Sequence, residues 1–150
     1  MKHFTAYILL CLSLLTAGCT QNDGHIGELF GSWAMTEYTV DGEEVTFPDG
    51  AYTTMSYQSD LVRFKYICTA TDDMRNSFGT WQRTAGMITF NFTHHNGGEE
   101  PGVGGYRAPE WLGLPASGIF DMDIAVKGKH LTLIWVDGGR RHIYKFERTW

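Results

Sequence analysis

The sequence predicts an all-β domain built from short antiparallel strands. Aromatic and β-branched residues are frequent beyond residue 30, and Gly or Asp-Gly interrupts them at short intervals. No long segment repeats apolar residues with the 3.6-residue period of a helix. Strands joined in this way by hairpin turns indicate an up-and-down meander, either a sandwich or a barrel.

Eight strands are expected, after one helical turn at 25–30. Short turns rich in Gly, Asp and Lys separate most of them, and residues 94–117 form one long connection between the fifth and the sixth. The expected strands are 32–40, 52–57, 61–69, 78–84, 87–93, 118–126, 130–136 and 140–148.

The last hairpin indicates which side chains point inward. With Gly138-Gly139 at the centre of the turn, Trp135 lies opposite His142 and Leu133 opposite Tyr144. Opposite residues share a face in an antiparallel pair, and this face is apolar. The same alternation along the other strands predicts the interior set: Trp33, Met35, Val62, Phe64, Tyr66, Trp81, Phe90, Met122, Leu133, Trp135 and Tyr144.

A short motif links the two ends of the domain. Gly31-Ser32-Trp33 opens the first strand, and Arg148 lies near the end of the last strand on its inward face. This pair resembles the signature of lipocalins and lipocalin-like barrels. The resemblance implies an eight-stranded antiparallel up-and-down barrel over residues 26–150, with Arg148 crossing the Trp33 ring at the closed end. The alternative is that Trp33 is a core aromatic of another β fold.

The N-terminus resembles the signal peptide of a bacterial lipoprotein. Lys2 supplies a positive charge, residues 4–15 are uncharged and mostly apolar, and small residues precede Cys19. The apolar run is shorter than the roughly 20 residues that span a bilayer. The resemblance implies cleavage after residues 1–18 and acylation of Cys19 by fatty acyl chains such as palmitate. Residues 19–25 would then form a tether. An ordinary secretory signal is the alternative.

Charge and cysteine content bound the partners. The net charge is −5 and no basic run is present, so nucleic-acid binding is not expected. If Cys11 leaves with the signal peptide and Cys19 is acylated, only Cys68 remains as a free thiol. It is expected to be a small buried residue. Thr20 stands where Asp would hold some lipoproteins at the inner membrane, which favours an outer-membrane location. The membrane is therefore an expected partner, through the lipid anchor, and an envelope protein is a further one.

The interior is expected to bind a small hydrophobic or amphipathic molecule, although side chains could equally fill so small a barrel. Arg83 and His142 fall on inward faces near turns, where they would either lie in solvent at a rim or grip an acidic group of a ligand. Glu37 is a further candidate for the inward face.

No catalytic motif, phosphate loop or cofactor site is recognised, so the chain is expected not to be an enzyme. His94-His95 with Glu99-Glu100 is not expected to bind metal, because adjacent residues of a strand point to opposite faces.

The 94–117 connection carries four large apolar residues: Tyr106, Trp111, Leu112 and Leu114. These side chains are costly to leave in water, which favours a connection that folds back and closes one barrel end. The alternative is that they remain exposed and contact a partner. In that case the protein would be a non-catalytic interaction lipoprotein with a filled barrel, acting through residues 94–117.

Overall fold

The computed structural model describes residues 27–94 and 106–149. The predictions of a signal peptide, of acylation at Cys19 and of a tether at 19–25 lie outside these residues. So do His95, Glu99 and Glu100 of the long connection.

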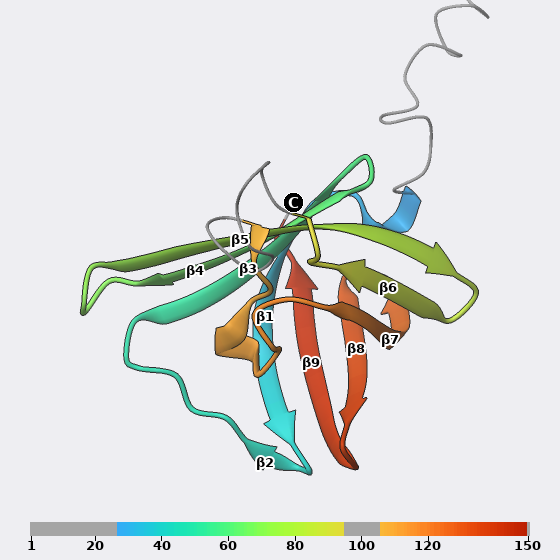
Figure 1. Cartoon of the computed structure of the whole chain (residues 1–150). Coiled ribbons are helices and arrows are strands. Elements are labelled where there is room, and N and C mark those ends of the chain that lie inside the picture. The colour runs from blue at the N-terminus through green and yellow to red at the C-terminus, as the bar shows by residue number, and fades with distance from the viewer. Residues whose placement is uncertain (1–26, 95–105, 150) are drawn as a thin grey trace, which may run out of the picture.

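A single antiparallel sheet curls into a barrel (Figure 1). Its strands follow one another in the order β2-β1-β3-β4-β5-β6-β7-β8-β9, and β1 also pairs with β9, which closes the sheet. The strands of the wall are β1 (Ser32–Val40), β3 (Ala51–Gln58), β4 (Leu61–Cys68), β5 (Asp73–Thr84), β6 (Met87–Asn91), β7 (Ile119–Lys127), β8 (His130–Asp137) and β9 (Arg140–Arg148). The two-residue β2 (Glu43–Glu44) only extends the end of β1. The prediction of an eight-stranded up-and-down barrel is therefore confirmed.

Most strand boundaries agree with the prediction within one residue, but β6 ends at Asn91 and not at 93, and β5 differs more. β5 begins at Asp73 and not at Phe78, because its first residues pair along β4, from Cys68 opposite Asp73 onward. Apart from Ser77 these residues are not buried, so backbone pairing rather than hydrophobicity places them in the strand. β2 was missed for the same reason, since both of its glutamates are exposed. The turn expected near residue 25 is present as the 3₁₀ helix η2 (Gly27–Leu29).

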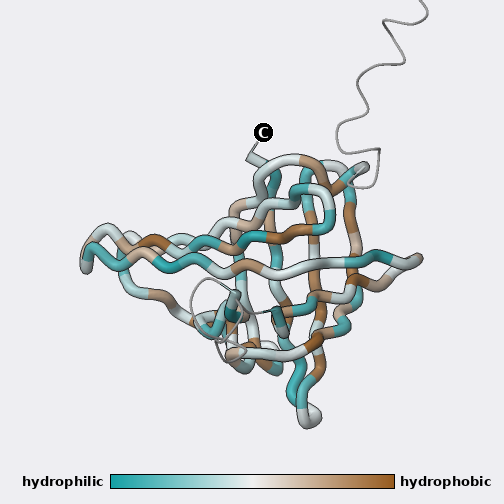
Figure 2. The backbone as a smooth tube through the Cα atoms, turned by 45° about the horizontal axis from the view of Figure 1, so that its top comes forward, coloured by the Kyte–Doolittle hydropathy of each residue, from teal (hydrophilic) through white to brown (hydrophobic). Residues whose placement is uncertain are grey.

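The predicted faces are largely confirmed. Trp135 lies opposite His142, and Trp81 lies opposite Phe90. Hydrophilic and hydrophobic residues alternate along the strands (Figure 2), as expected for a wall with one face toward a core and the other toward water. Of the predicted interior set only Met35 is partly buried, and all the others are buried.

Glu37 is an exception, and its predicted inward orientation is wrong. The register of β1 against β9 shifts between Met35 and Glu37, which marks a β-bulge. The extra residue reverses the alternation, so Tyr38 becomes the buried residue and Glu37 forms an ion pair with Lys145 at 2.8 Å on the outer face.

The barrel is closed at one end by the N-terminal segment. Trp33 is fully buried, and its indole Nε1 donates a hydrogen bond to the Leu29 carbonyl oxygen at 2.8 Å. The Arg148 guanidinium carbon lies 4.6 Å from the centre of the Trp33 ring, and Nη2 donates to the Glu28 carbonyl oxygen. The contact expected between Arg148 and Trp33 is confirmed, and it joins η2, β1 and β9.

Replacing Arg148 by alanine should destabilise this closure. The loss of the cation–π contact predicts a decrease of about 0.5–2 kcal/mol in the free energy of unfolding. The exposed Lys127→Ala, which removes a cation from the end of β7, should change the free energy by less than about 0.5 kcal/mol. Urea unfolding of both variants provides the measurement, and equal losses would assign no particular role to the Trp33–Arg148 contact.

Candidate functional site

The two barrel ends differ in what covers them. Helix η2 and the β3–β4 turn at Ser59-Asp60 lie at the closed end, which is uppermost in Figure 1. The long connection between β6 and β7 enters at the opposite end, which we call the mouth. Its described part, residues 106–117, is referred to below as the plug.

The plug lies inside the mouth. It contains the single-turn helix η4 (Glu110–Leu112), and Ala108, Leu112 and Leu114 are at most 4% exposed. Side chains of the wall hold its backbone: the Tyr144 hydroxyl donates to the Leu112 carbonyl at 2.8 Å, and the Ser77 hydroxyl donates to that of Arg107. The prediction that the connection closes one end is confirmed, although Tyr106 stays 39% exposed.

Almost no space remains beneath the plug. A void of about 10 Å³ is enclosed there, close to the minimum of about 10–15 Å³ that one water molecule requires. Its walls are Phe64, Leu112, Leu114, Met122, Leu133, Tyr144 and Phe146. Of the two alternatives left open by the sequence, this structure has the filled barrel, and plug side chains contribute to the filling.

Polar aromatic residues are buried beside the plug. The Tyr38 hydroxyl lies 2.9 Å from His142 Nδ1, and the Tyr38 ring is stacked 4.8 Å from that of Tyr144. The three side chains are at most 5% exposed. Burial raises the pKa values of both tyrosines above the usual 10, and burial, followed by the nearby Arg140, lowers the pKa of His142 below 6.5. These groups are therefore neutral at pH 7.

Several buried polar atoms near the mouth have no hydrogen-bond partner. They are His142 Nε2, Thr53 Oγ1 and Trp111 Nε1. Most buried polar groups in proteins are paired, so a cluster of unpaired ones indicates a place for water or a ligand. The sequence pointed to His142 and placed Trp111 in the connection, but Thr53 was missed. Its alternation with Met55 and Tyr57 on β3 could have identified it as an inward residue.

A second cavity lies beside the mouth, where β1 and β3 diverge. The two strands pair only from Ser32 to Ala34 on β1, and Phe47 covers the gap beyond, 6.3 Å from the rings of both Tyr38 and Tyr66. The cavity has a volume of about 300 Å³ and includes Met35, Tyr38, Phe47 and Thr53 among its lining residues. The cavity thus lies next to Tyr38 and Thr53 of the mouth.

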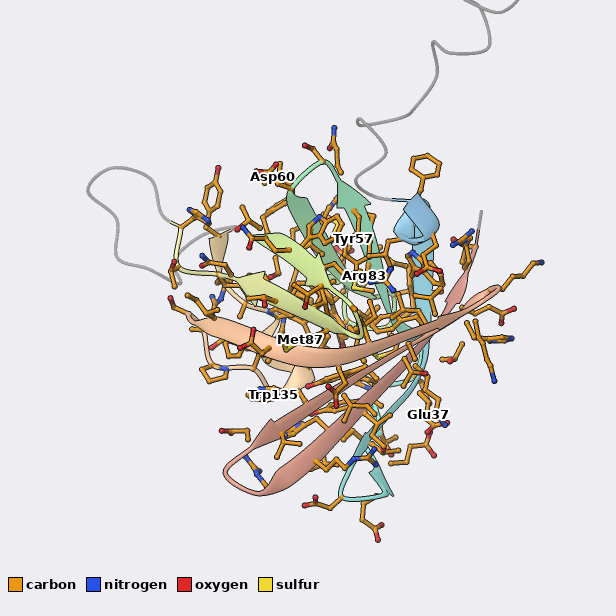
Figure 3. The ribbon with its side chains drawn as sticks, turned by 90° about the vertical axis from the view of Figure 1, so that its right-hand side faces the viewer. Glu37, Tyr57, Asp60, Arg83, Met87 and Trp135 are labelled. Carbon is orange, nitrogen blue, oxygen red and sulfur yellow. The ribbon has the colours of Figure 1, made fainter. Side chains whose placement is uncertain are left out.

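Arg83 is far from this cluster. It lies at the closed end, where it forms an ion pair with Glu28 at 2.6 Å and lines an open cavity of about 400 Å³ with Asp60 and Trp81. Figure 3 shows Arg83 and Asp60 at one end of the barrel and Trp135, whose ring contacts His142, toward the other. Arg83 therefore lies at a rim in contact with solvent, whereas His142 is buried near the other end. The two side chains cannot bind the same acidic group.

Other predicted features are placed as follows. Cys68 is a buried free thiol. Within residues 27–94 and 106–149, no group of three or more His, Cys, Asp or Glu side chains is arranged to hold a metal ion. The same residues contain no helix long and apolar enough to cross a bilayer.

Comparison with solved structures supports the fold. A lipocalin-like protein from Bacteroides uniformis aligns with 83% of this chain and 100% of its own, with a TM-score of 0.55 and 15% identity. An uncharacterized protein from Bacteroides eggerthii aligns with 78% of this chain and 98% of its own, with a TM-score of 0.54 and 14% identity. A fatty acid binding protein from Schistosoma mansoni, in complex with arachidonic acid, gives a TM-score of 0.44 over 85% of this chain and 100% of its own, at 11% identity.

No protein-family model matches the sequence, and no curated protein matches it. The similarity to the lipocalin-like protein from Bacteroides uniformis establishes a lipocalin-like fold, as the sequence predicted.

The seating of the plug can be tested at Gly113. A Cβ atom there would lie 2.7 Å from the Tyr38 hydroxyl oxygen, and the stacked, buried Tyr38 ring leaves that oxygen little room to move. Gly113→Ala should therefore destabilise the protein by about 1–3 kcal/mol more than Gly86→Ala. Gly86 is a matched control, because its φ of +79° equals that of Gly113 within a degree and no atom lies within 4 Å of its Cβ position.

Urea unfolding gives the difference in stability, and trypsin cleavage after Arg107 reports whether the plug has left the mouth. Equal losses of stability and equal cleavage in the two variants would show that the plug is not packed against Tyr38.

Proposed function

We propose that this protein is a lipid-anchored component of a bacterial cell envelope that binds a small hydrophobic or amphipathic molecule in its barrel, without catalysis. The ligand would occupy the space that the apolar side chains of the plug fill in this structure. Leu112 and Leu114 lie against apolar residues of the wall, and an apolar ligand would bury the same wall surface.

The way in which the plug is held is the observation that carries this proposal. The plug belongs to a connection, so its departure breaks no pairing between strands. It would break the hydrogen bonds from Tyr144 and Ser77 and uncover Leu112 and Leu114. A ligand that covers the exposed wall can offset that loss, and binding then selects the open form of the mouth.

The second candidate is an interaction lipoprotein with a permanently filled barrel. The small size of the void, about 10 Å³, favours it. Tyr106 and the half-buried Trp111 would then contribute to a contact surface for an envelope protein.

Binding of an all-carbon fluorescent probe distinguishes the two candidates. Diphenylhexatriene should bind the wild-type domain with a 1:1 stoichiometry, measured by fluorescence and native mass spectrometry. The double variant Leu112→Ala/Leu114→Ala should bind severalfold more tightly, because less apolar surface of the plug must be displaced. Ile119→Ala is the control, since Ile119 is 61% exposed on the outer face of β7.

Absence of binding by the wild type, with or without binding by the double variant, would favour the filled barrel. Binding by the double variant alone would report only the cavity that the two substitutions create.

The anchor and the location are proposed from the lipoprotein-like sequence around Cys19. The full-length chain should fractionate with the outer membrane, and Cys19→Ala should release it, because stable attachment requires acyl chains. Cys68→Ala removes the other thiol of the exported chain and should leave the protein on the membrane. A Cys19→Ala chain that still incorporates labelled palmitate or still sediments with membranes would contradict the anchor.

A further inference from the structure

We propose that the polar head of the ligand is uncharged and carries a hydroxyl group, bound at the mouth by His142 and Thr53. This inference rests on the proposed function and adds to it the chemical class of the ligand. It follows from two properties of the mouth, the unpaired polar atoms and the absence of a buried countercharge.

A series of contacts between aromatic side chains connects the residues that carry the three unpaired atoms. The Trp111 ring is 5.9 Å from that of Tyr66, and Thr53 faces Tyr66 across the β3–β4 pair. Phe47 bridges from Tyr66 to Tyr38, and the Tyr38 hydroxyl contacts His142. A polar head at the mouth would thus find unpaired hydrogen-bonding atoms of the wall on β3 and on β9 once the plug is displaced.

His142 and Thr53 are each 3% exposed, so water has little access to their unpaired atoms in this structure. Leaving a buried polar group without a partner costs about 1–3 kcal/mol. A ligand that supplies the missing partners gains that energy on binding.

The mouth offers no buried cation to a carboxylate. Among the described residues, the buried polar or charged side chains are Thr53, Ser77 and His142. Cations around the mouth already have acidic partners: Arg75 pairs with Asp73 at 2.6 Å, Lys145 with Glu37, and Arg107 with Glu110. Arg140, which lies near His142, is exposed and is 3.9 Å from Asp137. An ionised carboxylate inside the mouth would lose its hydration without gaining a countercharge.

A hydroxyl group suits the neutral His142. If Nδ1 accepts the Tyr38 proton, Nε2 carries a hydrogen and needs an acceptor, whereas in the other tautomer Nε2 needs a donor. A hydroxyl group satisfies either form. A hydroxyl group likewise suits the Thr53 hydroxyl, which donates and accepts.

The test compares three ligands that share one alkyl chain and differ only in the head group. Dodecanol is neutral, dodecanoate is anionic and dodecyltrimethylammonium is cationic at pH 7.5. Dodecanol is added below its solubility limit, and the two ions below their micelle concentrations, to the complex of the domain with diphenylhexatriene, and the loss of probe fluorescence is recorded. Dodecanol should displace the probe at concentrations at least tenfold lower than either ion.

Side-chain variants then identify the groups that bind the head. Thr53→Val removes a polar atom while largely keeping the shape, and it should weaken dodecanol severalfold without weakening diphenylhexatriene. Thr54→Val is the matched control, because Thr54 is the neighbour of Thr53 on the outer face of β3. It should leave both affinities unchanged.

The possible results separate the two proposals. If diphenylhexatriene binds but dodecanoate competes as well as dodecanol, the head-group inference is wrong and the binding function stands. Tighter binding of dodecyltrimethylammonium than of dodecanol would also contradict the head-group inference and would indicate a cationic head bound on the aromatic rings. Equal effects of Thr53→Val and Thr54→Val would also overturn it, since water alone would then satisfy the buried atoms. If diphenylhexatriene does not bind, both proposals fail.

Discussion

Pairing between the first and the last strands of the wall is the interaction on which the rest of the structure depends. β1 and β9 lie together from Trp33 opposite Arg148 to Val40 opposite His142, and this pairing leaves no open edge between them. By closing the sheet, the same pairing also creates an enclosed interior. The aromatic residues of the core can meet across the barrel only because the wall is continuous, and the Trp33–Arg148 contact fixes where it closes. The bulge in β1 belongs to the same pairing and turns Tyr38 toward the mouth.

Once the barrel is closed, its interior must be filled by something. At the closed end the wall side chains and Leu29 of η2 suffice. At the mouth the chain uses part of a connection. Unpaired polar atoms occur at both ends, since Trp81 Nε1 and Arg148 Nε at the closed end also have no hydrogen-bond partner. Apolar side chains of the plug fill the volume, yet polar atoms of the wall and of Trp111 remain unpaired. Local departures from good pairing of this kind are typical of functional sites. At the mouth, the side chains that stabilise the closed barrel occupy the space that a ligand would need.

Much of the architecture could be predicted because strand alternation and hairpin turns are local properties of a sequence. The Gly138-Gly139 turn set the register of the last hairpin, and from it followed the inward positions of Trp135, His142 and Tyr144. Glu37 could not be predicted, since a bulge is one extra residue without a distinct signal of composition. The separation of Arg83 from His142 also follows from the predicted up-and-down order, because the end of strand 78–84 and the start of strand 140–148 lie at opposite ends of the barrel. Interior positions were therefore predictable, whereas the bulge that turns Tyr38 toward the mouth was not.

The positions of the chain ends have a consequence for the direction in which cargo can move. Gly27 begins η2 at the closed end, and the backbone N–H of Thr149 donates to the Ser32 carbonyl at that same end. With an acyl group on Cys19, as proposed, a stretch of about eight residues would reach roughly 28 Å at most. The closed end would then rest near the bilayer while the mouth opens toward the aqueous side. Exchange of a hydrophobic cargo would proceed with whatever lies opposite, such as a soluble shuttle or a facing membrane, and not with the lipids that hold the protein.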